Sequence, residues 1–430
     1  MEISLLGFGI LLLLVFLGLP LSFSMILVGA GGFAIIRNVT GALAMSSQQI
    51  VDISTNFGFS VLPLFVLMGA FVHRADLSRD LYDAANSWLG HRRGGLALAT
   101  VVACGGFAAI SGSSLATAAT MTKVAMPPMR RYGYDGGLAA GTIAAGGTLG
   151  ILIPPSVPMV IYGILTETDI GQLFIAGIVP GILMVGLYAA SILVVTTVRP
   201  EWGPRAPRVP LVERWPYLAR VWGVVALFLL VMGGIYGGIF TPTEAASIGA
   251  FGAMMFVLWR RRLTWKTLIG SLAEAGRTTG TIFTVGFGAL IFSNFVNVAG
   301  LPRDLVAIIE AVDVSPIGVV LVICLILIVL GMVFDALAMI LLTVPVFFPI
   351  VASLGLDPIW FGIIVIVVVE IGLITPPIGL NVFVVKSVAP DVPLGEIFKG
   401  IVPFFLASVV GLALIILFPA IALFLPGLMR

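Results

Sequence analysis

Charged residues are scarce in this sequence. Asp, Glu, Lys and Arg make up 10% of its 430 residues, against about a quarter in a typical soluble domain. Hydrophobic residues make up 60%, and the mean hydropathy is +1.19. The apolar stretches are continuous rather than alternating, which indicates membrane-spanning helices and not the strands of a barrel. The sequence therefore predicts an all-α polytopic membrane protein.

Cysteine and histidine are almost absent, with two residues of each. Cys104 and Cys324 lie in apolar stretches, so we expect buried single thiols rather than a disulfide or a metal site. Ser113 and Lys123 are about 15 Å apart at helical rise, too far for a catalytic pair. With no histidine in a predicted span, these absences argue against an intramembrane enzyme. A net charge of +2 gives no reason to expect a nucleic-acid partner.

Two long apolar stretches contain a di-proline, at Pro154-Pro155 and at Pro376-Pro377, and the numbering offset between them is 376 − 154 = 222. Proline removes a backbone donor and clashes with the preceding turn, so we predict broken helices over residues 137–165 and 359–386. Carbonyls freed within a membrane are tolerated only where they are buried in protein or line a cavity. Broken helices at matching places in two halves are typical of the substrate and ion sites of transporters.

A short polar segment interrupts another apolar stretch in each half. Residues 94–128 contain Ser111-Gly112-Ser113-Ser114, and residues 317–350 contain Phe334-Asp335-Ala336. Each leg is about long enough to cross the membrane, or slightly short of it. We therefore predict two re-entrant hairpins with polar tips.

The two halves match at this one fixed offset, which pairs Ser113 with Asp335 and Gly150 with Gly372. Each half contains five predicted spans and one hairpin. Because five is odd, the halves must face opposite sides of the membrane, as in inverted-repeat transporters. We predict a first repeat over residues 1–198, a Pro- and Arg-rich cytoplasmic linker over 199–220, and a second repeat over 221–430.

The basic residues predict the orientation. Placing the interfacial segment 73–93 in the cytoplasm puts all but Arg37, Arg303 and Arg430 of the 22 Lys and Arg on that side, as the positive-inside rule requires. Both termini are then periplasmic, and the first hairpin enters from the cytoplasm. His73 and His91 are expected to be solvated. Residues 37–56 and 260–277 are interpreted as polar connectors.

The hairpin tips and helix breaks are the candidate site. A sodium ion needs several oxygen ligands, which hydroxyls, Asp335 and freed carbonyls would supply. Half-helix N-termini after each break favour an anionic substrate. Several roles have two readings. The serine tip could be a close helix contact of small residues. Asp335 and Glu370 are intramembrane acids and so functional candidates, although Glu370 could instead brace the broken helix. Glu244 fits a helix start, and Asn381 lies one turn after the second break.

Four motifs together resemble the large membrane subunit of tripartite ATP-independent periplasmic (TRAP) transporters. They are residues 109–114 (AISGSS), 150–156 (GILIPPS), 241–245 (TPTEA) and 372–381 (GLITPPIGLN). The resemblance covers essentially the whole chain. It implies a sodium-driven, elevator-type importer of organic anions, carboxylates or sialic acid, in the bacterial inner membrane. It also implies a periplasmic substrate-binding protein and a small four-helix membrane subunit, which we expect to be a separate chain because this one begins at the first span of the large subunit.

The resemblance also implies site residues. The sodium sites carry over to Ser111, Gly112, Ser113, Gly150, Pro154, Asp335, Gly372, Thr375 and Pro376. We assign Ser114, Ser156 and Asn381 to the substrate, and a structural or coupling role to Glu244 and Glu370. No cofactor is expected besides Na⁺ as the coupling ion. The alternatives are a stand-alone sodium- or proton-coupled carboxylate symporter and, from another class, an intramembrane enzyme.

Overall fold

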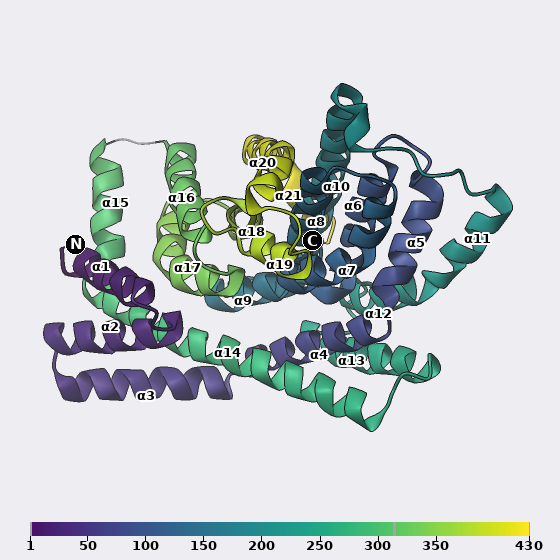
Figure 1. Ribbon diagram of the computed structural model, residues 1–430. Coiled ribbons are helices and arrows are strands. Elements are labelled where there is room, and N and C mark those ends of the chain that lie inside the picture. Colours follow the sequence, from purple (N-terminus) through teal and green to yellow (C-terminus); the bar gives the residue numbers. More distant parts are fainter. Residues whose placement is uncertain (1, 313–314, 430) are drawn as a thin grey trace.

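The computed structural model describes residues 2–312 and 315–429, and every regular element in that part of the chain is helical (Figure 1). Six of the described helices are long and apolar enough to cross a membrane: Phe57–Arg74, Gly136–Thr166, Ile170–Val198, Trp265–Val298, Ala336–Ser353 and Leu394–Leu417. This confirms an all-helical, multi-span membrane protein. Among the ten expected spans, α1 (Glu2–Phe16), α2 (Leu21–Ile36) and α12 (Trp222–Tyr236) contain only 15 or 16 residues, fewer than the roughly 20 that a span perpendicular to the bilayer needs.

The N-terminal helices are α1 (Glu2–Phe16), α2 (Leu21–Ile36), α3 (Val39–Thr55), the short 3₁₀ turn η1 (Phe57–Ser60) and α4 (Val61–Arg74). Helix α3 occupies the stretch expected as a polar connector. Asn38 begins it, because its side chain accepts a hydrogen bond from Gly41 N. This cap stabilises the start of the helix, and α3 packs against α2 and α14.

The first hairpin and broken helix follow. Helix α5 (Leu77–Leu89) leads to α6 (Gly95–Ser111) and α7 (Ser114–Arg131), which form the hairpin. The broken helix consists of α8 (Gly136–Leu152) and α9 (Val157–Thr166), and α10 (Ile170–Val198) ends this half. An aspartate caps the N-terminus of α8 and of α10, since Asp135 accepts from Leu138 N and Asp169 accepts from Gln172 N.

The linker is only partly a loop, because it contains η2 (Pro200–Trp202) and α11 (Leu211–Arg220). It leads to α12 (Trp222–Tyr236), α13 (Pro242–Trp259), α14 (Trp265–Val298) and α15 (Leu301–Val312). Helix α14 has 34 residues. It includes most of residues 260–277, which were expected to form a polar connector. Thr264 begins it by accepting from Thr267 N, so the polar stretch continues into the span without a turn.

The second hairpin consists of α16 (Pro316–Gly331) and α17 (Ala336–Ser353), and the second broken helix of α18 (Pro358–Ile374) and α19 (Leu380–Val388). Helices α20 (Leu394–Leu417) and α21 (Ala420–Gly427) end the described chain. The hairpins and broken helices begin and end within three residues of their expected bounds. Helices α7 and α17 match at both ends at the offset of 222, and so do α8 and α18.

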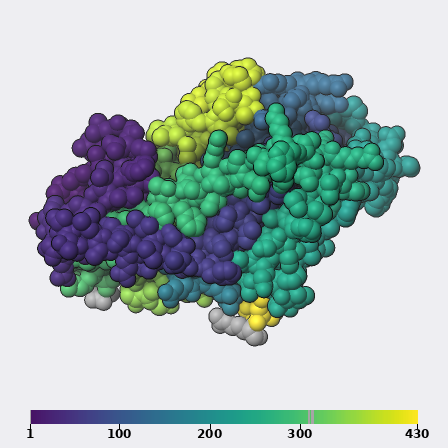
Figure 2. Space-filling model, turned by 90° about the horizontal axis from the view of Figure 1, so that it is seen from below, coloured from purple at the N-terminus to yellow at the C-terminus, as the bar shows by residue number. Residues whose placement is uncertain are grey.

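The N-terminal helices pack beside α13 and α14. Figure 2 shows the purple N-terminal residues against the green residues of this region. The approach is close: a Cβ atom added to Gly29 of α2 would lie 2.7 Å from the Phe292 Cα atom of α14. Small residues of this kind allow helix backbones to meet in membranes.

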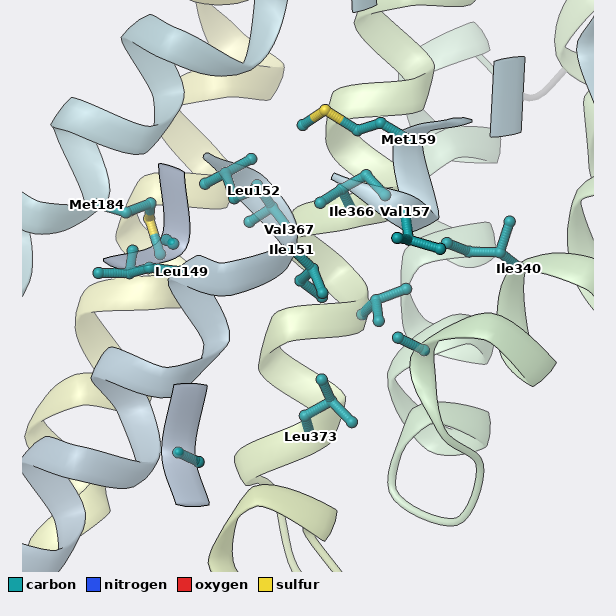
Figure 3. Close-up of a cluster of buried hydrophobic side chains, with 14 of the residues drawn as sticks. Leu149, Ile151, Leu152, Val157, Met159, Met184, Ile340, Ile366, Val367 and Leu373 are labelled. Carbon is teal, nitrogen blue, oxygen red and sulfur yellow. The ribbon is translucent and has the colours of Figure 1, made fainter. Parts of the chain in front are cut away.

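The two broken helices meet in the interior of the molecule. Both α8 and α18 are buried along almost their whole length. Figure 3 shows Ile151, just before the first break, beside Val367 of α18, while Val157, just after it, points toward Ile340 of α17. Both broken helices and the second hairpin thus share one apolar core, and the polar tips lie beside it.

Candidate functional site

Both hairpin tips line one cavity of about 300 Å³. The first tip contributes Ser111, Gly112, Ser113, Ser114 and Leu115, and the second contributes Asp335, Ala336 and Leu337. Ser113-Ser114-Leu115 and Asp335-Ala336-Leu337 are matching triplets at the offset of 222. The remaining wall comes from α4, α6, α7, α14 and the two helices of the first break. Segments from opposite halves of the sequence therefore meet at one site.

The first tip is ordered by its own hydroxyl groups. Ser113 begins α7, with its Oγ atom accepting a hydrogen bond from Ala116 N at 3.4 Å. The Thr117 hydroxyl donates to the Ser113 carbonyl at 2.7 Å and lies 2.8 Å from Ser111 Oγ, so Ser111 donates in that pair. Gly112 has φ of 63°, a conformation that disfavours residues with a Cβ atom. Capping explains part of this arrangement and leaves lone pairs on Ser113 for a ligand.

The first break packs directly against this tip. A Cβ atom on Gly150 would lie 2.6 Å from the Ser113 carbonyl oxygen, and one on Gly112 would lie 3.1 Å from the Pro155 carbonyl oxygen. Because glycine has no Cβ atom, backbone oxygen atoms of the tip and of the break can lie close together at both places. Pro154 is buried within the break. Oxygen atoms in this arrangement are the ligand type that hard cations prefer.

Ser156 lies inside the same break and does not line the cavity. It is fully buried, donates to the Ile151 carbonyl at 2.5 Å and accepts from Met159 N. It therefore satisfies a carbonyl that the prolines free and begins α9. This contact gives Ser156 a structural role, in addition to the predicted role in substrate binding.

Asp335 holds the corresponding place at the second tip. Its Oδ2 atom accepts from Leu337 N at 3.2 Å, and it begins α17. The side chain is partly buried and faces the cavity. It is one of two carboxylates among the lining residues, the other being Glu274. The tip therefore presents an acidic group close to the serine tip of the first half.

The second break lies apart from this cavity, since Gly372, Thr375 and Pro376 do not line it. The Thr375 hydroxyl donates to the Ile371 carbonyl at 2.5 Å, and Pro376 is exposed. A Cβ atom on Gly372 would lie 2.7 Å from the Gly331 Cα atom, so this glycine packs against the leg of the hairpin rather than against its tip. The cavity thus brings Ser111, Gly112 and Ser113 together with Asp335. Gly150 and Pro154 of the first break do not line it either, although Gly150 packs against the tip.

Three further expected residues lie outside the cavity. Asn381 is fully buried and donates to the Ala144 carbonyl of α8 at 3.1 Å. Glu370 is also fully buried, and its carboxyl group lies beside the Thr148 hydroxyl of α8. Glu244 is exposed and forms a capping box with Thr241 at the start of α13. This is the helix-start role that its place in the sequence suggested.

Sequence reasoning missed the polar residues of the opposite wall: His73, Thr120, Lys123, Glu274 and Thr278. His73, expected in solvent, has its Nδ1 atom 3.0 Å from the Thr120 hydroxyl. A signal was present, because Ala116, Thr120 and Lys123 follow the tip at spacings of four and three residues, along one helix face. The contribution of α4 and α14 depends on tertiary packing and left no local pattern.

A family model described as "Tripartite ATP-independent periplasmic transporter, DctM component" matches residues 8–421. The chain belongs to this family. It is 40% identical over 382 residues to the C4-dicarboxylate TRAP transporter large permease protein DctM of Pseudomonas aeruginosa, covering 88% of each chain. It is 34% identical over 417 residues to the sialic acid TRAP transporter large permease protein SiaM of Vibrio cholerae, covering 96% of each.

Two further likenesses extend this comparison. The ectoine TRAP transporter large permease protein TeaC of Halomonas elongata is 33% identical over 420 residues, with 96% of this chain and 97% of the relative covered. The crystal structure of the Alcanivorax borkumensis YdaH transporter, described as having an unusual topology, superposes with a TM-score of 0.62 at 16% identity over 90% of each chain. That likeness concerns the fold alone. The relatives are transporter permease subunits, which confirms that this large TRAP permease subunit is a transport protein and not an enzyme.

Proposed function

We propose that this permease subunit imports a small organic anion, a carboxylate or a sialic-acid-like molecule, by symport with sodium ions. The observation that carries the proposal is the convergence of Ser113 and Asp335, each at a hairpin tip, on one cavity. A cavity of about 300 Å³ lies at the small end of the range for ligand sites, which suits a small substrate. The relatives named for C4-dicarboxylates and for sialic acid support the substrate class.

The chemistry of the tips suits both solutes. Hydroxyl, carboxylate and carbonyl oxygens at Ser111, Ser113 and Asp335 are hard ligands for a cation. Helices α7 and α17 both begin at the cavity, and their N-termini carry partial positive charge that favours an anion. Sodium would order the tips, and the anion would then bind between them. Gly150 and Pro154 would add backbone oxygens of the first break to this site.

The second break would serve a second sodium site, formed around Gly372, Thr375 and Pro376. We further propose that the halves 1–198 and 221–430 are inverted repeats joined at 199–220, with matching bounds of α7 and α17 as support. The hairpins and broken helices would move together, and the remaining helices would act as a scaffold. This is the elevator-type motion implied by the family resemblance.

Two partners complete the proposed system. A periplasmic binding protein would deliver the substrate, and a small four-helix membrane subunit would brace the scaffold as a separate chain. The relatives named as large permease proteins support a division between large and small subunits. We place the protein in the bacterial inner membrane, with both termini in the periplasm, because that orientation agrees with the distribution of Lys and Arg.

Uptake into proteoliposomes tests this function. The vesicles would contain this subunit with its small partner, and a candidate binding protein outside would carry radiolabelled organic acid. Uptake that needs both the inward sodium gradient and the binding protein would support the proposal. Uptake with sodium but without the binding protein would instead indicate a stand-alone symporter.

Proton coupling is the second candidate mechanism, and Glu370 is the observation that favours it. Its carboxyl group is fully buried, with the neutral Thr148 hydroxyl beside it, and intramembrane acids often carry protons. The Glu370→Gln variant separates the mechanisms. Sodium-driven uptake should stay within about threefold of the parent, because Glu370 lies outside the cavity. Loss of uptake in this variant, together with parental uptake that follows a proton gradient, would replace sodium by protons.

A further inference from the structure

Lys123 is a cavity residue that the proposed sodium sites do not use. It lies on α7 and lines the cavity together with Ala116 and Thr120. These positions are spaced by four and three residues, so they share one face of the helix. That face begins at Ser113 and runs without interruption from the polar tip to the lysine.

The direction of α7 turns this side chain toward the tip. In an α-helix the Cα–Cβ bonds tilt toward the N-terminus, and the N-terminus of α7 is the hairpin tip at Ser113. Ten residues separate Ser113 from Lys123, about 15 Å along the axis. The lysine side chain therefore leans from its Cα atom toward the tip and covers part of this distance, beside the cavity that it lines.

The ammonium group of Lys123 is also available to a ligand. The nearby acid of the cavity wall, Glu274, is paired with Arg74 at 3.1 Å. Across residues 2–312 and 315–429, no ion pair involves Lys123, and its side chain is exposed. An anion that enters the cavity can therefore reach this ammonium group.

We propose that Lys123 binds the carboxylate of the transported anion, at the end of the cavity opposite the sodium ligands of the hairpin tips. The proposal rests on the proposed function, because it assigns a specificity residue to the same cavity. The anion would lie between the sodium at the tips and the Lys123 ammonium group, so that positive charge would flank it at both ends. The lysine would favour carboxylates over neutral molecules of similar size.

The neighbouring wall supports this placement. His73 of α4 contacts Thr120, one turn before Lys123, with 3.0 Å between the ring nitrogen and the hydroxyl. This contact holds the lysine-bearing face of α7 against α4, beside the cavity. The competing reading is a lysine that only contacts lipid headgroups near the cytoplasmic surface. That reading predicts no effect on anion affinity.

Equilibrium binding tests the proposal directly and needs no binding protein. The complex of this chain with its small partner would be placed in nanodiscs in sodium buffer. Binding of radiolabelled succinate and N-acetylneuraminate would be measured by scintillation proximity. Lys123→Met should raise the Kd of the bound anion about ten- to a hundredfold, the range for losing a hydrogen bond to a charged group. Lys123→Arg should stay within about threefold of the parent.

Two controls make the result specific. Arg131→Met removes a positive charge from the same helix at an exposed position that does not line the cavity, and it should leave the Kd unchanged. The sodium concentration for half-maximal binding should also stay unchanged in Lys123→Met, because the tips are intact. Lys123→Gln provides a second neutral variant should the methionine variant be poorly inserted.

The outcomes separate the two proposals. An unchanged Kd in either neutral variant would overturn the role of Lys123 and leave the proposed function standing. A tenfold loss that Arg131→Met shares would also overturn it, since the effect would then be one of general surface charge. If the parent complex neither binds nor takes up either anion, the proposed function itself fails, and this proposal fails with it.

Discussion

The two helix breaks share a sequence pattern but differ in their surroundings. At the first break the prolines are buried, and Ser156 both caps α9 and accommodates the Ile151 carbonyl. At the second break Pro376 and Pro377 are exposed. Ile378 takes the place of Ser156, since 156 + 222 = 378, and no side chain caps α19. The two breaks therefore satisfy a freed carbonyl differently. Ser156, which follows the prolines, does so at the first break, and Thr375, which precedes exposed prolines, does so at the second.

The difference extends to the hairpins. The first tip touches its own break through Gly150 and Gly112, while Gly372 of the second half packs against Gly331 in the hairpin leg. Sequence repeats fix where the chain can break, because that follows from local backbone chemistry. They do not fix which atoms meet across the break, because that depends on packing between helices. Equivalent positions can thus have unequal roles. Substituting both members of a matched pair and comparing uptake and thermal stability measures the difference between the two breaks.

The largest effect is expected at the two tips. Asp335→Asn and Ser113→Ala should each lower sodium-driven uptake about 100-fold or more, as expected when a charged or ion-binding partner is lost. Asparagine caps helices about as well as aspartate, so Asp335→Asn removes the charge and keeps the start of α17. Uptake assays at matched membrane insertion provide the measurement. Parental uptake in both variants would refute the site at the tips.

A methyl group at the glycines should have the next largest effect. Gly150→Ala would push against the Ser113 carbonyl, and Gly372→Ala against the Gly331 backbone. Overpacking of this kind costs about 1–3 kcal/mol, so both variants should melt at lower temperature. Only Gly150→Ala should raise the sodium concentration for half-maximal uptake, because it displaces the tip. The comparison fails if Gly372→Ala raises that concentration more.

Removing the polar group that closes the first break should have a moderate effect. Ser156→Ala loses a cap and leaves the Ile151 carbonyl without that donor, which costs about 1–3 kcal/mol. The matched change at the second break, Ile378→Ser, places a serine one residue before Gly379, the N-cap residue of α19. Thermal unfolding in detergent should show destabilisation for Ser156→Ala only. Equal melting temperatures for parent and Ser156→Ala would show that the first break does not depend on this closure.

The smallest effect is expected at Glu244, far from both breaks in the chain. Glu244→Ala removes half of the capping box with Thr241 and should lower the melting temperature only slightly, with uptake unchanged. Glu244→Gln preserves a capping-box residue and serves as the control. A loss of uptake in both variants at normal insertion would instead indicate a coupling role.

Much of the fold follows from the sequence because its signals are local. Pro-Pro pairs and short polar interruptions locate the breaks and tips, including Ser113 and Asp335. The interpretation of residues 260–277 as a polar connector was wrong for most of its length, because α14 begins at Trp265 with Thr264 as its cap. The placement of Thr375 outside the cavity and of Lys123 inside it depends on how distant helices pack. The sequence of one segment alone does not show which distant helices pack around the cavity.

The most direct test of the account asks whether the two tips share one substrate cavity. Leu115 and Leu337 are matched positions of the two halves, and both line the cavity. Each would be replaced by cysteine in a background with Cys104→Ala and Cys324→Ala, the two buried native cysteines. Labelling by a water-soluble maleimide would then be followed with sodium and the transported anion. If both tips face the substrate, both cysteines should be protected over the same anion concentration range. Protection at Leu115→Cys alone would contradict the account, because the second tip would then lie outside the substrate site.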